Sequence, residues 1–223
     1  MRKGWRPLLS LFLLGCLPAV HAAPLHLQCE QAAPGPAEAK RIARLANGVV
    51  KRDGKHALSV HTAGGTLRLV DKPPHDEPLS GVHYTFCDRR DGFILIAVDD
   101  ETLGTGLLVN EASGQASRVG HDILFSPDRR AYLATEQPDG MDGARWKIHA
   151  VDGTLSWSGY SFIPREGKES EFTASLDTPA WTDTGEFTAM AQCVGPSETR
   201  WKVKLIKAKG SWQWLPKRQC PRP

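Results

Sequence analysis

Two clusters of carboxylates are the residues of this chain best suited to chemistry. They lie at 99–101 (DDE) and 139–143 (DGMDG), each between two β-type runs. Carboxylates so placed can bind calcium, but neither cluster has the spacing of a known calcium loop, and plain hairpin turns explain both. The two clusters occupy equivalent places in successive repeats. In a propeller, such places lie on one common face, where ligands usually bind. The predicted binding residues there are Asp99, Asp100, Glu101, Asp139 and Asp142.

The histidines and serines show no catalytic or metal-binding spacing. His56 and His61 are five residues apart across one β-type run, while His75 and His83 lie in or beside a loop. No H-E-x-x-H or G-x-S-x-G motif occurs. We therefore expect surface histidines, no metal, no cofactor and no identifiable catalytic residue.

Six tryptophans follow residue 22, and most are expected in the core. Trp146 and Trp201 occupy equivalent positions in two similar runs, which is what core packing produces. Trp212 is out of phase with Trp214, so it is predicted to be exposed and is our sixth candidate binding residue. Several exposed, coplanar tryptophans would instead indicate a sugar-binding platform.

Residues 1–22 have the three parts of a secretory signal peptide. A basic start (Arg2, Lys3, Arg6) precedes a ten-residue apolar run, and Val20 and Ala22 are the small residues before the predicted cleavage. The run is shorter than the roughly 20 residues that span a bilayer, and no later segment is apolar enough. We predict an exported, periplasmic or secreted protein without a transmembrane segment.

A lipid anchor is the alternative to signal cleavage. Residues 13–16 (LLGC) are similar to a bacterial lipoprotein box, in which Cys16 would be lipidated. Leu14 fits that box poorly, and an apolar stretch follows Cys16. Loss of residues 1–22 would leave 25 basic and 25 acidic side chains, so net charge gives no case for nucleic acid or an anionic membrane.

The four remaining cysteines predict two disulfides. Cys29, Cys87, Cys193 and Cys220 form an even set in an exported chain, with no C-x-x-C motif and no zinc-type spacing. Four cysteines allow three pairings. Cys193 with Cys220 is favoured because the two flank the last repeat, which leaves Cys29 with Cys87, and the main rival is a Cys29–Cys220 link between the chain ends.

One strand–turn–strand pattern recurs four times along the chain. Turns at 51–54, 89–92, 126–129 and 182–185 each precede an apolar β-type run, and the run 145–151 (RWKIHAV) is echoed at 200–206 (RWKVKLI). Such a unit cannot bury its own apolar face, so neighbouring units must stack. Residues 160–178 are polar extra length, interpreted as an insertion loop whose start lies on the same face as the acidic clusters.

The best of these turns resembles a known repeat family. Residues 125–128 (FSPD), followed by 131–134 (AYLA), resemble the turn of WD-repeat and periplasmic Tol-type propellers. The resemblance covers 45–216 as a pattern only; the Trp-Asp pair is absent and Arg129 replaces Gly. It implies a scaffold for protein contacts and no catalytic residue.

The expected fold is all-β, with about four repeats of a four-stranded antiparallel unit arranged like a β-propeller. Because Lys147 and His149 form a polar strand face, an open stack or sandwich of antiparallel sheets is the alternative. The expected organisation is a signal peptide (1–22), an N-terminal extension with a short helix (23–47) and one β-repeat domain (48–223).

The leading functional hypothesis is a non-catalytic interaction or binding module of the cell envelope. An envelope protein or a cell-wall glycan would be its partner. The alternatives are an envelope hydrolase acting on glycan or peptide, and a carbohydrate- or peptidoglycan-binding protein.

Overall fold

The computed structural model describes residues 24–29, 35–75, 80–100, 105–137, 143–165, 168–195 and 199–220, with the backbone alone at 168–170. The predicted signal peptide with Cys16 lies outside these residues. So do three of the predicted binding residues, Glu101, Asp139 and Asp142.

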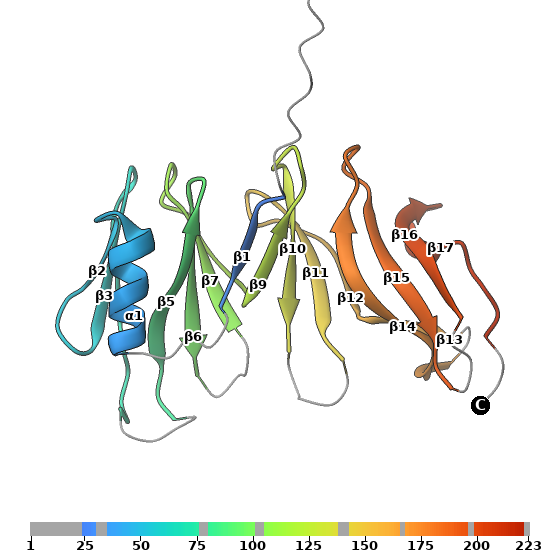
Figure 1. Ribbon diagram of the computed structural model, residues 1–223, viewed down its shortest axis with the longest axis horizontal. Helices are drawn as coiled ribbons and strands as arrows, with labels where there is room; N and C mark the ends of the chain where they lie inside the picture. The colour runs from blue at the N-terminus through green and yellow to red at the C-terminus, as the bar shows by residue number, and fades with distance from the viewer. Residues whose placement is uncertain are drawn as a thin grey trace, which may run out of the picture.

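The chain is all-β and forms four antiparallel sheets that stand in a row (Figure 1). The first sheet contains β2 (Val50–Arg52), β3 (Ala57–Thr62) and β4 (Gly65–Val70), and the second contains β5 (His83–Arg90), β6 (Phe93–Asp99), β7 (Thr105–Asn110) and β8 (Ala116–Gly120). The third contains β1 (His26–Gln28), β9 (Asp122–Phe125), β10 (Ala131–Glu136), β11 (Arg145–Ala150) and β12 (Leu155–Tyr160). The fourth contains β13 (Phe162–Arg165), β14 (Lys168–Trp181), β15 (Phe187–Cys193), β16 (Arg200–Ala208) and β17 (Ser211–Leu215).

One short helix covers the front of the first two sheets (Figure 1). It begins as α1 (Pro36–Arg41) and continues as one π-helical turn, η1 (Ile42–Ala46). Pro36 suits the first helical position because its missing N–H needs no partner there. Asn47 ends the helix in the left-handed conformation at φ 46°.

Three buried apolar clusters join consecutive sheets. One lies between the helix, the first sheet and the second, around Leu58 and Phe86. The next joins the second and third sheets around Leu95 and Phe125, and the last joins the third and fourth sheets around Trp146. Each sheet therefore buries its apolar face against a neighbour, as stacked repeats require.

The four sheets are not the four equal propeller blades that we expected. Only the second sheet has four strands, because the first has three and the other two have five each. In Figure 1 the first and fourth sheets stand at opposite ends of the row, and no buried cluster of the described residues joins them. The arrangement agrees with the alternative, an open stack of antiparallel sheets.

The two extra strands come from segments for which no strand was expected. β1 lies in the N-terminal extension and pairs with β9, so the extension completes the third sheet. The segment 160–178 is not an insertion loop, because β13 and β14 form a hairpin within it. Polar side chains did not prevent strand formation there, since that hairpin is only partly covered.

The strands of the first sheet point the opposite way from the prediction. The four-repeat pattern placed the 51–54 turn at the same edge as the 89–92 turn, but the structure does not. The turns at 63–64, 91–92 and 111–114 contact one another through the hydrogen bonds Ala63 N to Glu111 O and Glu111 N to Gly92 O. We call this side of the stack the turn edge and the opposite side, where β5 begins and β6 ends, the loop edge. The 53–56 turn lies at the loop edge, because its His56 stacks on His75 just before β5. It is therefore not equivalent to the 91–92 turn.

An exposed ion pair links equivalent turns of neighbouring sheets at the turn edge. Arg129 adopts a positive φ of 57°, a conformation that usually favours glycine. Its Nη2 lies 2.6 Å from Asp91 Oδ2. Arg129, which stands where the repeat family has glycine, thus places its guanidinium against the preceding sheet.

The favoured cysteine pairing is confirmed. Cys29 bonds to Cys87 with a Cα–Cα distance of 4.9 Å, and Cys193 bonds to Cys220 at 5.5 Å. The rival Cys29–Cys220 link is wrong. The first disulfide ties the chain after β1 to β5, which fixes the extension against the second sheet.

Candidate functional site

A groove of about 280 Å³ opens between β1, the helix and β5. Three of its lining side chains are arginines. We call it the basic groove. Its walls are His26 and Gln28 from β1, Arg41, Arg44 and Leu45 from the helix, and Cys87, Asp88 and Arg90 from β5.

The helix wall is positioned by a buried ion pair. Glu38 is 2% exposed, and Arg52 of β2 donates to it twice, from Nε at 2.8 Å and from Nη2 at 3.1 Å. Glu38 also accepts a hydrogen bond from the Phe86 N–H at 2.7 Å. A carboxylate this deep needs such a full set of partners. The helix is thereby fixed to both β2 and β5.

Neighbouring side chains cover the edge of β5 that pairs with no strand. Arg41 Nε donates to Phe86 O at 3.0 Å, and the Tyr84 N–H donates to Asp71 at 2.9 Å. Arg52 donates to Tyr84 O. An uncapped strand edge invites pairing with another chain, and these side chains block it. The groove therefore presents side chains, not a strand edge, over this stretch.

The β1 wall is held by one acidic residue. His26 Nε2 lies 2.6 Å from Asp122 Oδ1 of β9, and Gln28 Nε2 donates to Asp122 Oδ2 at 3.2 Å. Burial alone would raise the pKa of Asp122, but these hydrogen bonds and the charge of His26 hold it below its usual value. Asp122 is thus a carboxylate paired within the wall.

The groove carries more positive than negative charge. Arg90 is paired with Asp88, with its Nε 3.1 Å from Asp88 Oδ2. Arg44 is exposed, and its side chain makes no hydrogen bond or ion pair with the described residues. Arg41, at the end of α1, and Arg44, in the π-helical turn, both line the groove. Guanidinium forks of this kind bind carboxylate and phosphate groups through two parallel hydrogen bonds.

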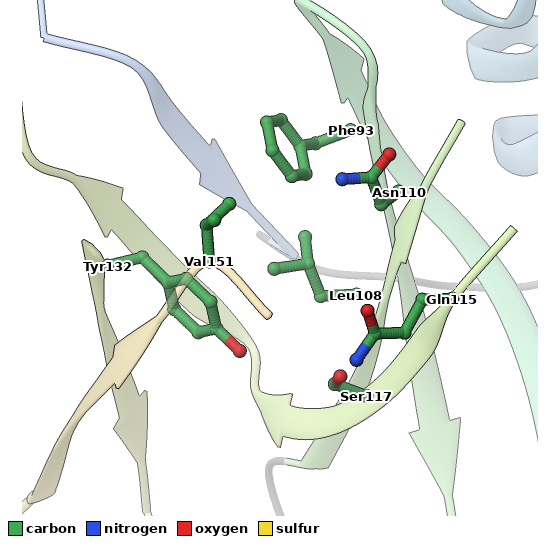
Figure 2. Close-up of a pocket in the computed structure, with 7 residues that line it drawn as sticks. All are labelled: Phe93, Leu108, Asn110, Gln115, Ser117, Tyr132 and Val151. Carbon is green, nitrogen blue, oxygen red and sulfur yellow. The ribbon is translucent and has the colours of Figure 1, made fainter. Parts of the chain in front are cut away.

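The second hollow is too small for a ligand. Figure 2 shows it between the second and third sheets, with Phe93, Leu108 and Tyr132 among its walls. Its volume of about 10 Å³ is close to that of one water molecule. The Tyr132 hydroxyl is buried and has no hydrogen-bond partner among the described residues. Burial together with the charge of Asp152 raises the pKa of Tyr132 to about 12.

Three histidines that look unrelated in the sequence meet at the loop edge. The His75 ring stacks on His56 with centroids 4.0 Å apart and lies 6.1 Å from His83. Asp71 Oδ2 lies 3.7 Å from His56 Nδ1 and 4.0 Å from His83 Nδ1. We call His56, His75, His83 and Asp71 the histidine cluster.

The histidine cluster does not have the geometry of a metal site. Among the described residues, no group of three His, Cys, Asp or Glu side chains is arranged to hold a metal ion. His56 and His75 stack at an interplanar angle of 24°, so their ring nitrogens do not converge on one point. Their contact is ring on ring.

Asp99 and Asp100, two of the predicted binding residues, also lie at the loop edge. Asp99 is opposite His83 in the β5–β6 register, and partial burial raises its pKa against the opposing charge of His83. Asp100 is paired with Arg118. Neither residue lines the basic groove.

Trp212 is exposed as predicted, at 38%, and the Lys207 ammonium lies 5.9 Å from its ring centroid. Trp146 and Trp201 are buried at 3% and 5%, which confirms the core assignment drawn from their equivalent positions. Trp212 stands on the fourth sheet, away from the groove walls.

The sequence reasoning missed the groove residues. Arg41 and Arg44 stand on the short helix that was predicted within the N-terminal extension, but no binding role was predicted for it. Arg90 stands at a turn to which only a structural role was assigned. The i, i+3 spacing of Arg41 and Arg44 was the one available signal. Their meeting with His26 and Arg90 depends on β1 joining the third sheet, which the sequence did not show.

No family model, curated protein or solved structure matches this chain. The resemblance to WD-repeat and Tol-type propellers therefore stays a prediction. The two disulfides indicate an oxidising, exported compartment. Within the described part of the chain, no helix is long and apolar enough to cross a membrane.

Proposed function

We propose that this chain is an exported, non-catalytic binding module, periplasmic or secreted, and that the basic groove is its binding site. The ligand class that fits is a small molecule or exposed group with clustered carboxylate or phosphate oxygens. The observation that carries this proposal is the convergence of Arg41, Arg44 and Arg90 on one groove of about 280 Å³.

The excess of arginines over paired carboxylates at the groove supports an anionic ligand. Asp88 balances Arg90, whereas Arg44 has no such partner among the described residues. Asp122 beside the groove accepts a hydrogen bond from Gln28 and lies 2.6 Å from His26 Nε2, so its oxygens are already occupied within the wall. An anion bound here would also be partly shielded from solvent by the walls, which strengthens its attraction to the guanidinium groups.

The rigidity of the walls supports a binding role. The Cys29–Cys87 disulfide holds the β1 side, and the Glu38–Arg52 pair holds the helix side. A site whose walls are fixed before the ligand arrives loses less conformational freedom on binding. The groove is thus preorganised by contacts that lie beneath it.

Isothermal titration calorimetry with citrate and with pyrophosphate tests the proposal. We expect at least one of them to bind, and to bind more weakly at higher salt because exposed charges are screened. Arg44→Gln should weaken binding about tenfold, the effect of one lost charge-assisted hydrogen bond. Arg68→Gln is the matched control, because Arg68 is an exposed arginine of β4 outside the groove.

Equal affinity of the Arg44→Gln and Arg68→Gln variants would contradict the proposal. So would the absence of binding by both anions at low salt. Neutral glucose serves as the second control, since a sugar-binding surface at Trp212 would bind it without any effect of Arg44→Gln.

A further inference from the structure

The strand β1 leaves one of its two edges without a neighbouring strand, and that edge faces the basic groove. β1 is the first strand of the third sheet, so it pairs with β9 on one side only. The walls of the groove include His26 and Gln28 of β1 but no described residue of β9. The groove therefore lies on the unpaired side of β1, next to the helix and β5.

The register of the β1–β9 pair shows which backbone groups point toward the groove. Leu25 O accepts a hydrogen bond from β9 at 2.9 Å, and the Cys29 N–H donates to the residue before β9 at 2.8 Å. Residues of an antiparallel strand alternate between those that bond to the partner and those whose N–H and C=O point away. The backbone groups of His26 and Gln28 therefore point away from β9.

These backbone groups are available to a ligand. The N–H and C=O groups of His26 and Gln28 have no hydrogen-bond partner among the described residues, and both residues are partly exposed. Their side chains are already engaged, because Gln28 donates to Asp122 and His26 Nε2 lies 2.6 Å from it. The edge of β5 is different, since side chains already bond to Tyr84 and Phe86 there.

An extended peptide is the ligand that matches this row of donors and acceptors. A peptide backbone carries N–H and C=O groups at the spacing of a strand, and it can join a free sheet edge as one more strand. Arg44 lies beside the row, and its side chain has no partner among the described residues. A peptide whose last residue is acidic has two carboxylates close together, which suits the guanidinium groups of the groove.

We propose that the ligand of the basic groove is an extended peptide with an acidic last residue. Its backbone pairs with β1 as an added strand, and its terminal carboxylates bind the arginines of the helix. This assignment rests on the function proposed for the groove. The main-chain hydrogen bonds add to the attraction between charges, so the peptide binds more tightly than citrate.

Calorimetry with the peptide acetyl-Thr-Val-Thr-Val-Asp and its N-methylated forms tests the strand pairing. A methyl group on a nitrogen that donates to β1 removes that hydrogen bond, whereas one on the next nitrogen points away from β1. We expect methylation at one position to weaken binding about fivefold, the effect of one lost neutral hydrogen bond, and methylation at the next to have little effect. The C-terminal amide should bind about tenfold more weakly, because it lacks a charged partner for the arginines.

Gln28→Pro tests the same edge from the side of the protein. Proline removes the N–H that points toward the groove, and an edge strand tolerates proline where the N–H is not used within the sheet. Gln28→Ala is the matched control, because it loses the same side-chain hydrogen bond to Asp122 but keeps the N–H. We expect Gln28→Pro to bind the peptide about fivefold more weakly than Gln28→Ala does, and the two to bind citrate equally.

The outcomes distinguish this ligand from the function proposed for the groove. Binding of citrate or pyrophosphate together with equal effects of both methyl positions overturns the peptide assignment and leaves the anion site standing. Absence of binding by the peptide and by both anions contradicts the groove function itself. A dimer of this chain that Gln28→Pro abolishes would assign the edge to a second copy and would also overturn the peptide assignment. The methylated peptides are measured on the unmodified chain, so their result does not depend on how Gln28→Pro folds.

Discussion

Arg52 lies between two carboxylates that belong to different surfaces of the molecule. Its Nε is 2.8 Å from Glu38 Oε2 at the helix, and its Nη1 is 3.8 Å from Asp71 Oδ2 at the loop edge. Its Nη2 also donates to the backbone oxygen of Tyr84 in β5. A single residue of the short strand β2 thus holds the helix, the first sheet and the second sheet together.

The first prediction concerns the buried Glu38–Arg52 pair. Glu38→Gln keeps the size of the side chain but removes its charge, which leaves Arg52 without its main partner. We expect the free energy of unfolding in urea to fall by about 3 kcal/mol, as for other broken buried ion pairs. Glu186→Gln is the control, because Glu186 and Lys204 are both more than 40% exposed. It should cost less than about 1 kcal/mol. Equal costs would show that burial does not decide the effect.

The second prediction concerns the pH dependence of Asp122. Its pKa is lower in the folded chain than in the unfolded chain, because His26 and Gln28 stabilise the carboxylate. Such a group contributes stability above its unfolded-state pKa, and that contribution is lost as pH falls through the folded-state pKa. Asp122→Asn should therefore lower the melting temperature at pH 7 and have a smaller effect at pH 2.5. A constant effect at both pH values would refute the linkage.

The third prediction concerns the buried hydroxyl of Tyr132. Its pKa is raised to about 12, so the unfolded chain ionises first, near pH 10. The protonated hydroxyl therefore contributes to the free energy of unfolding fully below pH 10, and this contribution is lost as pH rises through about 12. Tyr132→Phe should remove this alkaline loss and raise the stability at pH 7 by about 1 kcal/mol, since no described residue bonds to the hydroxyl. Denaturation curves at pH 7 and 11 measure both effects. A stability loss at pH 11 equal to that of the unmodified chain would contradict this account.

The fourth prediction separates the two disulfides. Replacing both cysteines of either pair by serine should cost about 4 kcal/mol, because the closed loops of 58 and 27 residues differ little in closure entropy. Their effects on anion binding should differ. Loss of Cys29–Cys87 frees one wall of the groove and should weaken citrate or pyrophosphate binding, whereas loss of Cys193–Cys220 should not. Calorimetry of the two double variants at matched temperature is the measurement.

Much of the strand order was predictable from the sequence. Alternation placed Trp146 and Trp201 in the core, and Asp or Gly turns marked the hairpins correctly, because these signals are local. The cysteine pairing followed from the same repeat frame. The frame failed in the first sheet, where Asp53-Gly54 has the local chemistry of the other turns but lies at the opposite edge.

The candidate site was not predictable for a physical reason. His56, His75 and His83 come together only because the 53–56 turn and the start of β5 share the loop edge. Arg44 and Arg90 line one groove only because the helix docks through Glu38. Both meetings depend on long-range packing, which the local periodicity of a strand or helix does not encode.

Binding at the groove is tested most directly by NMR of the arginine side chains. The Nε–H signals of Arg41, Arg44 and Arg90, assigned by Arg→Lys substitution, are followed while pyrophosphate or citrate is added at low salt. The account predicts that these signals shift together and saturate, while that of Arg68 on β4 does not move. Equal, non-saturating shifts of all four, or no shift at all, would contradict it.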